Sequence, residues 1–329
     1  MNGATPQKSR PNWKKIVTMA LFVVLIALLA WYVWQNRADM ARLLSLDAGT
    51  VALLLLFAFC GCVMNCVYHR IVLSTFRVPL SLVDWMGVVM VANTMAYVLP
   101  LRADLVFSAA YYKKVKGLAY TRSVSIAAGN IVFGVTFSLL EILVALICCG
   151  LKDGLWPLPL WLLTVGGLVC VAAFWVVALV LGEKPPAFVR KYRILRETVE
   201  GFVQLLRDRR MLLQVVGCLA ANHCFHLLLY MVCFHAVGME ITIYEALLYN
   251  RMSWLSTILT IVPGNIGIKE AVMGTVTGLM GSLFQNGVMV SLLQRVTIMI
   301  IYIVCGTAFA WPVFRRMKQA DAAAEANHE

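Results

Sequence analysis

Charged residues are scarce in this chain of 329 residues, at 13% against a hydrophobic fraction of 61%. A soluble globular domain carries about 25% charged residues, so this scarcity excludes that class. The short alternating segments of an outer-membrane barrel are also missing. Several apolar runs instead exceed the roughly 18 residues that mark a membrane-spanning helix. The composition therefore predicts an all-α polytopic membrane protein.

Sequence signatures of nucleotide and metal chemistry are missing as well. The chain has no Walker motif, so we expect no ATP hydrolysis. It has no paired CxxC motifs, and its ten cysteines lie in or beside apolar runs, which argues against a zinc site and a disulfide framework. His223 and His226 are one helical turn apart, but no further ligand accompanies them. We therefore expect no cofactor, no metal and no enzyme activity.

The excess of basic residues has a topological explanation. The formal net charge is +12, and membrane proteins concentrate lysine and arginine on their cytoplasmic loops. We therefore expect no nucleic-acid partner. About six runs are long enough to cross a bilayer, and they cover residues 16–34, 50–68, 123–151, 160–181, 212–237 and 287–314.

Two further apolar segments are short or broken. Trp85–Leu99 has about 15 residues, against the roughly 20 that a span needs, and Pro100 ends it. Tyr244–Phe284 is interrupted by the PGNIG sequence that begins at Pro263. Two re-entrant hairpins that enter from opposite faces would place most of the 28 lysines and arginines on the cytoplasmic side. Such a pair is typical of an inverted-repeat transporter, and eight ordinary spans are the alternative.

The same distribution of charge predicts three parts of the chain and an orientation. Residues 1–15 are a cytoplasmic N-terminal segment, residues 16–314 a single transmembrane domain, and residues 315–329 a cytoplasmic polar tail. Basic residues flank both ends of the transmembrane domain. Both termini are therefore predicted to be cytoplasmic.

Polar residues recur at helical spacing along three of the predicted spans. Asn130 and Glu141 belong to one stripe, His226 to a second and Arg295 to a third. Ionisable groups in hydrocarbon are costly and normally face a bundle interior or a wet cavity. Small and polar residues also pack helices together in lipid, which is the alternative for the weaker members of each stripe. The stripes predict a polar interior.

The carboxylate of Glu270 has two interpretations. A helix that restarts near Ile266 would have Glu270 in its first turns, where the helix dipole favours a carboxylate, with Asn265 as its cap. Alternatively, backbone N–H groups freed by the two glycines of PGNIG offer an anion site. Lys269 then lies nearby, Glu270 pairs with Arg295, and phosphate is the expected anion. The two interpretations are compatible.

Two motifs resemble those of the lysylphosphatidylglycerol synthetase/flippase membrane-domain family. VPGNIGIKEAVMG, followed by SLLQRVTIMIIYIVCG, is similar to its C-terminal signature. The matching residues are Pro263, Gly264, Gly267, Glu270 and Arg295. The earlier motif of that family is similar to a looser set, formed by Asn93, Leu99, Pro100, Arg102 and Asp104, with Leu101 and Ala103 where glycine is common.

The resemblance implies a multi-pass protein of the bacterial inner (cytoplasmic) membrane that takes part in lipid translocation or modification. Two-part members of the family carry a soluble aminoacyltransferase domain after the membrane domain. This chain ends in a short polar tail, so we expect no lipid aminoacylation by it alone.

We predict a flippase-like lipid translocase that moves a phospholipid or lipid-linked head group through a polar cavity. The alternative is a non-transporting membrane partner of a lipid-modifying or glycosyltransferase enzyme. Expected partners are the lipid substrate, such an enzyme and a second copy of the chain. The predicted substrate-binding residues are Arg102, Asp104, Asn130, Glu141, His226, Pro263, Gly264, Gly267, Lys269, Glu270 and Arg295.

Overall fold

The computed structural model describes residue 34 and residues 46–76, 78–98, 102–183, 209–258 and 265–326. Within these residues the regular structure is helical, without a strand. Five helices are long and apolar enough to cross a membrane, in agreement with five of the six predicted spans. They are α3 (Ala48–Ser74), α6 (Tyr120–Asp153), α7 (Leu158–Glu183), α10 (Arg209–Ala236) and α13 (Phe284–Ala326). The first predicted span lies outside the described residues, except for its last residue. The chain is therefore a multi-pass α-helical membrane protein.

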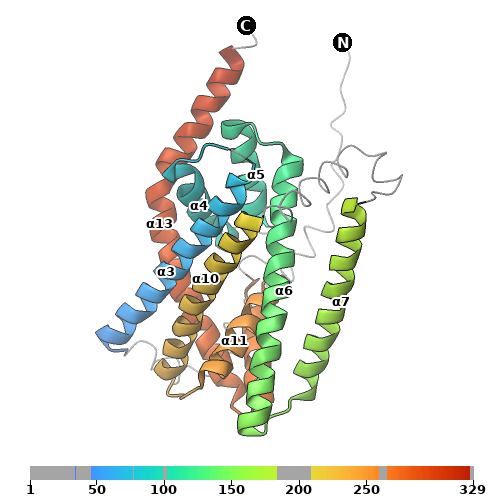
Figure 1. Ribbon diagram of the computed structural model, residues 1–329. Helices are drawn as coiled ribbons and strands as arrows, with labels where there is room; N and C mark the ends of the chain where they lie inside the picture. The colour runs from blue at the N-terminus through green and yellow to red at the C-terminus, as the bar shows by residue number, and fades with distance from the viewer. Residues whose placement is uncertain are drawn as a thin grey trace, which may run out of the picture.

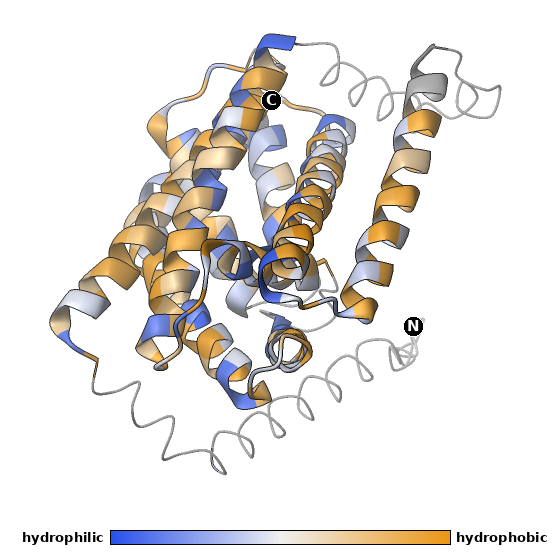
Figure 2. Cartoon of the chain, turned by 60° about the horizontal axis from the view of Figure 1, so that its bottom comes forward, coloured by the Kyte–Doolittle hydropathy of each residue, from blue (hydrophilic) through white to orange (hydrophobic). Residues whose placement is uncertain are grey.

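The long helices form a bundle with one peripheral member. In Figure 1, α3 and α10 pack together across the centre of the molecule, α13 follows one edge and α7 stands at the opposite edge. Helix α7 packs mainly against α6. Figure 2 shows that hydrophobic residues dominate the long helices along most of their length, as expected for surfaces that face lipid.

Two pairs of short helices complete the described structure. A turn of π-helix, η1 (Val83–Gly87), leads into α4 (Val88–Val98), which is followed by α5 (Ala103–Lys116). The second pair is α11 (Ile243–Ser256) and α12 (Ile268–Leu279). These four helices have 11 to 14 residues, which corresponds to about 16–21 Å at 1.5 Å per residue. Each is shorter than the roughly 30 Å hydrocarbon core.

The predicted short segments are thus confirmed as short helices. The breaks themselves, at residues 99–101 and 259–264, lie outside the described residues, and with them Pro100, Pro263 and Gly264. In Figure 1 the α4–α5 pair lies near the end of the bundle that holds the C-terminus, whereas α11 lies near the other end.

Local sequence explains where several helices begin. The Asp47 carboxylate accepts a hydrogen bond of 3.0 Å from the Thr50 N–H and caps α3. Thr242 and Glu245 form a capping box at α11, in which each side chain satisfies a backbone N–H of the other residue. Such caps satisfy donors that the first turn of a helix leaves unpaired.

Helix α13 packs against both short pairs, and a glycine allows each close approach. A Cβ on Gly306 would overlap the Thr94 hydroxyl of α4. A Cβ on Gly287 would overlap the backbone carbonyl of Met273 in α12. Small residues let helix backbones approach closely within a membrane. The two pairs are therefore seated on one common helix.

Candidate functional site

A cavity of about 750 Å³ with charged side chains in a largely apolar wall lies between the two pairs of short helices. Its walls come from α3, α4, α5, α6, α10, α11, α12 and α13. Buried apolar and aromatic side chains border it, among them Leu73, Tyr230 and Tyr302. The charged side chains that line it are Arg102, Asp104, Arg251, Lys269 and Arg295.

The start of α12 is fixed by a buried ion pair. Glu270 is 3% exposed, and Arg295 of α13 approaches its Oε1 with Nη2 at 2.7 Å and Nε at 2.8 Å. The other oxygen of Glu270 accepts a 2.8 Å hydrogen bond from the Gly267 N–H. Gly267 has a φ of 85°, a conformation that favours glycine. The position of Glu270 at a helix start and its pairing with Arg295 are therefore confirmed. The anion site at the glycine N–H groups stays a prediction, because Glu270 occupies the Gly267 N–H and Gly264 lies outside the described residues.

The predicted cap at Asn265 is wrong. Helix α12 begins at Ile268, with Gly267 as its N-cap. Asn265 is 4% exposed and adopts a φ of 55°, and its side-chain amide donates a 2.8 Å hydrogen bond to the Ser256 carbonyl at the end of α11. Its backbone carbonyl accepts from Arg295 at 3.2 Å. Asn265 thus ties the two short helices and α13 together.

Lys269 lies beside this pair and lines the cavity. Its side chain is buried, and Nζ donates a hydrogen bond to the side-chain oxygen Oε1 of Gln294 in α13. Lys269 therefore presents its side-chain nitrogen to the cavity while a neutral amide holds it in place.

A second ion pair, in which the arginine is buried and the carboxylate half-buried, lies behind the cavity wall. Glu141 of α6 contacts His223 Nδ1 of α10 at 2.6 Å and Arg251 Nε of α11 at 3.3 Å. Arg251 is 2% exposed and lines the cavity, whereas Glu141 does not. Through these two contacts Glu141 joins α6 to α10 and α11 inside the bundle.

The first short pair presents a weaker ion pair. Arg102 stands at the N-cap of α5 with a φ of 56°, in the left-handed region that is uncommon for a residue with a side chain. Its Nε is 3.9 Å from the Asp104 carboxylate. Asn93 of α4 also lines the cavity, and its amide donates a 2.8 Å hydrogen bond to the Val89 carbonyl.

The polar stripe of α10 divides into packing residues and cavity residues. Cys218 and Asn222 donate hydrogen bonds to α3, at Met64 O (3.3 Å) and Gly61 O (2.8 Å). A Cβ on Gly61 would lie 2.9 Å from the ring of His226. Asn222 and His226 also line the cavity. Both interpretations of such stripes, packing and polar interior, therefore apply to this helix.

The structure brings together most of the predicted site residues. Arg102, Asp104, Asn130, His226, Lys269 and Arg295 line the cavity. Glu141, Gly267 and Glu270 do not line it. Glu141 and Glu270 are ion-pair partners of arginines that do line it. The Gly267 N–H donates a hydrogen bond to Glu270. Pro263 and Gly264 lie outside the described residues.

Sequence reasoning missed several polar residues of this site: His223, Asn250, Arg251 and Gln294. Asn250 and Arg251 interrupt the apolar run of the second broken segment. A basic residue inside such a run is itself a signal for a polar interior. Gln294 precedes Arg295 in the sequence, and its role depends on the side chain of Lys269 from another helix, which no local pattern reveals.

A separate network of charges lies where η1, α5 and α13 meet. The fully buried carboxylate of Asp84 contacts Lys116 Nζ and Arg316 Nη1, each at 2.8 Å. It also accepts hydrogen bonds from the Tyr111 hydroxyl at 2.8 Å and from the Ser81 N–H and hydroxyl at 2.7 Å. This Asp84 network anchors the beginning and the end of the first pair to α13.

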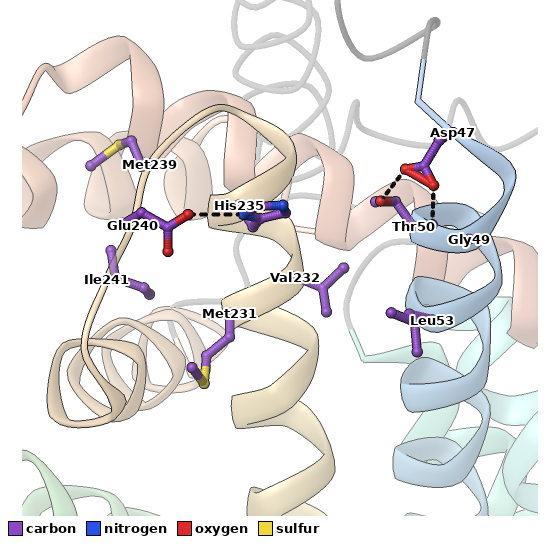
Figure 3. A pocket seen from close by; sticks show the side chains of 10 residues that line it. All are labelled: Asp47, Gly49, Thr50, Leu53, Met231, Val232, His235, Met239, Glu240 and Ile241. Atoms are coloured by element: carbon purple, nitrogen blue, oxygen red, sulfur yellow. Dashed lines mark hydrogen bonds and ion pairs between the residues drawn. The ribbon is translucent and has the colours of Figure 1, made fainter.

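A smaller hollow of about 480 Å³ lies between the start of α3 and the end of α10. Figure 3 shows its polar side chains bonded to sequence neighbours: Asp47 to Thr50, and His235 to Glu240 at 3.1 Å. The His235 and Glu240 side chains are largely exposed. These contacts serve helix ends, and they place no buried charge in the hollow, unlike the cavity.

Fold and cavity together define a class: a polytopic α-helical membrane protein whose bundle encloses a charged cavity. The family described as Lysylphosphatidylglycerol synthase TM region matches residues 17–306. The chain belongs to this family, which confirms the resemblance and connects the protein with lipid handling. No curated protein and no solved structure matches the chain.

Proposed function

We propose that the protein is a flippase-like translocase of the bacterial inner membrane, which moves a phospholipid or lipid-linked head group through the cavity. The observation that carries the proposal is the cavity itself, because it places four cationic side chains within a bundle of apolar helices. Such groups are costly in hydrocarbon and mark pathways for polar substrates.

The edges of the cavity suit a substrate with acyl chains. Val124 and Ile131 of α6 and Ile258 beyond α11 line the cavity, and all three are exposed on the surface of the bundle. A lipid whose head group binds among the charges would therefore have apolar side chains beside its glycerol and acyl portions. Acyl chains can remain in the bilayer while the head group is sheltered.

The two pairs of short helices support an inverted arrangement of re-entrant hairpins. Each helix is too short to span the membrane, the pairs lie toward opposite ends of the bundle (Figure 1), and the cavity lies between them. Inverted repeats with broken helices place a substrate site near the midplane. Under the positive-inside rule the hairpins enter from opposite faces, and both termini are cytoplasmic.

The proposal is tested by lipid movement in proteoliposomes. The purified full chain is reconstituted with a trace of fluorescent phospholipid, and the fraction that a membrane-impermeant quencher reaches is followed with time. We expect faster exchange than in empty vesicles. Equal rates in empty and loaded vesicles would contradict translocation, and a stably co-purifying lipid enzyme would then favour the non-transporting alternative.

One cavity variant separates transport from folding. Asn130→Leu replaces a polar wall residue by an apolar one of similar size and removes no ion pair of the described residues. We expect it to slow lipid exchange while the protein keeps its melting temperature. A matched control is Thr307→Val on α13, whose hydroxyl donates to the carbonyls of Ile303 and Val304 outside the cavity. This control should exchange lipid at the rate of the unmodified protein.

A further inference from the structure

We propose that the cavity selects a lipid head group of net negative charge, and that Lys269 and Arg251 bind its phosphate. The inference rests on the proposed translocase function and names the class of lipid. It concerns residues from two adjoining short helices, α11 and α12, of which sequence reasoning assigned only Lys269.

The charges in and behind the cavity wall do not cancel. Among the residues that the structure describes, four cationic side chains line the cavity, and three carboxylates lie in it or directly behind it. Every one of the three carboxylates already has an arginine as its partner. The pairs are Arg102–Asp104 at 3.9 Å, Arg251–Glu141 at 3.3 Å and Arg295–Glu270 at 2.7 Å. Four cations minus three carboxylates leave one positive charge, that of Lys269.

Within the described part of the chain, the hydrogen-bond partner of the Lys269 ammonium is a neutral amide. Its Nζ donates to Gln294, and among the described residues no carboxylate oxygen lies within 4 Å of this nitrogen. A buried ammonium without an anion is unfavourable, since no countercharge offsets its loss of water. A phosphate oxygen that enters the cavity would form a charge-assisted hydrogen bond with Nζ and supply the missing countercharge.

Arg251 has an N–H group that the described residues leave without an acceptor. Its guanidinium is 2% exposed, and its Nη1 has no hydrogen-bond partner among the residues that the structure describes. Glu141 lies at 3.3 Å from the Nε on the other side of the same group. Buried polar groups are nearly always satisfied, so an unpaired donor in a cavity wall points to a ligand. An anion is the ligand that a guanidinium binds best.

The same wall offers little to a cationic head group. Within the described residues, Asp104 is the sole carboxylate that lines the cavity, and Arg102 is beside it. An amino group on the lipid would have to displace an arginine from a carboxylate and would face Lys269. The order of affinity should therefore be an anionic phosphodiester first, a zwitterionic lipid second and an aminoacylated lipid last.

Equilibrium lipid binding tests this order without requiring transport. The purified full chain in detergent is mixed with equal amounts of phosphatidylglycerol, phosphatidylethanolamine and lysylphosphatidylglycerol of identical acyl chains, and bound lipid is counted by native mass spectrometry. We expect phosphatidylglycerol to bind about tenfold tighter than the lysyl lipid. Equal binding of the three, or preference for the lysyl lipid, overturns the inference. This ranking requires no variant and so does not depend on the folding of one.

Variants and a soluble competitor locate the effect. Lys269→Met should weaken phosphatidylglycerol binding about tenfold and flatten the ranking. The control Lys114→Gln removes an exposed lysine that pairs with Asp321 outside the cavity, and it should keep the ranking. An unchanged ranking in Lys269→Met contradicts the assignment. Glycerol phosphate at equal concentration should fail to displace the lipid if the site needs acyl chains, whereas displacement would identify a site for free phosphate esters and overturn the lipid assignment.

The binding and exchange experiments test the two hypotheses independently. Selective binding without lipid exchange would support the anionic cavity and contradict translocation. Lipid exchange without any head-group preference would support translocation and contradict the anionic cavity.

Discussion

The two pairs of short helices are attached to α13 by ion pairs of different kinds. The second pair is held at the start of α12, where Glu270 and Arg295 are both almost fully buried. The first pair is held at its outer ends, where Asp84 is fully buried but the Arg316 side chain is 35% exposed. At the start of α5, Arg102 Nε lies 3.9 Å from the Asp104 carboxylate, and the two side chains are 36% and 22% exposed.

This difference assigns the two pairs different parts in the same cavity. The second pair contributes the start of α12 as a buried wall, because ion pairs deprived of water are disrupted only at high cost. The first pair contributes the start of α5, where the charges of Arg102 and Asp104 are accessible. Exposed ion pairs contribute little to stability, so Arg102 can exchange Asp104 for a substrate group more readily than Arg295 can exchange Glu270.

Removing the buried arginine should have the largest effect. Arg295→Ala leaves the Glu270 carboxylate buried without its cation, which costs about 3–5 kcal/mol of unfolding free energy. Denaturation in mixed micelles measures this loss. The double variant Glu270→Met with Arg295→Met should lose less than Arg295→Ala alone, because it leaves no unpaired charge. Equal stability of Arg295→Ala and the unmodified protein would contradict the buried pair.

The pair at Glu270 and Arg295 shows what sequence predicts well. Their spacing in the PGNIG segment and the last span, together with the family motif, predicted the pairing before the structure. The five described spans followed from the length of apolar runs. Asp84 carried no comparable signal, since its partners Lys116 and Arg316 come from distant helices. Gln294 was missed for the same reason: a cavity wall is assembled by packing, which a local pattern does not encode. Arg251 did carry a local signal, as a basic residue inside an apolar run.

The Asp84 network should give the next largest effect. Asp84→Asn removes the charge that Lys116 and Arg316 share, and we expect a loss of about 2–3 kcal/mol, since hydrogen bonds to charged groups are the strong ones. The loss is smaller than for Arg295→Ala because the exposed part of Arg316 regains water. The same mixed-micelle denaturation ranks the two variants, and a larger loss for Asp84→Asn would reverse the comparison.

Glycine substitutions on α13 compare how the two pairs are packed. Gly287→Ala places a Cβ against the Met273 backbone, which cannot rotate away, whereas Gly306→Ala meets the end of the Thr94 side chain. Overpacking costs about 1–3 kcal/mol, and we expect Gly287→Ala in the upper half of that range and Gly306→Ala in the lower. Gly166→Ala is the control, as nothing lies within 4 Å of its added Cβ. Similar losses in all three would contradict the close contacts.

Acid should weaken the first attachment. Burial raises the pKa of Asp84, but hydrogen bonds from Lys116, Ser81 and Tyr111 outweigh burial and hold that pKa well below its usual range. A carboxylate with a lowered pKa adds stability above its unfolded pKa of about 3.9, and that stability is lost as the pH falls. The melting temperature should therefore drop below about pH 4, and Asp84→Asn should show a shallower drop. Identical pH profiles would exclude Asp84 as a cause.

The most direct measurement is a cryo-EM map of the full chain in nanodiscs that contain phosphatidylglycerol. The account predicts head-group density in the cavity between the two short pairs, within hydrogen-bond distance of Lys269 Nζ and Arg251 Nη1, with the Glu270–Arg295 pair intact. Lipid density confined to the outer surface of the helices, with an empty cavity, would contradict it.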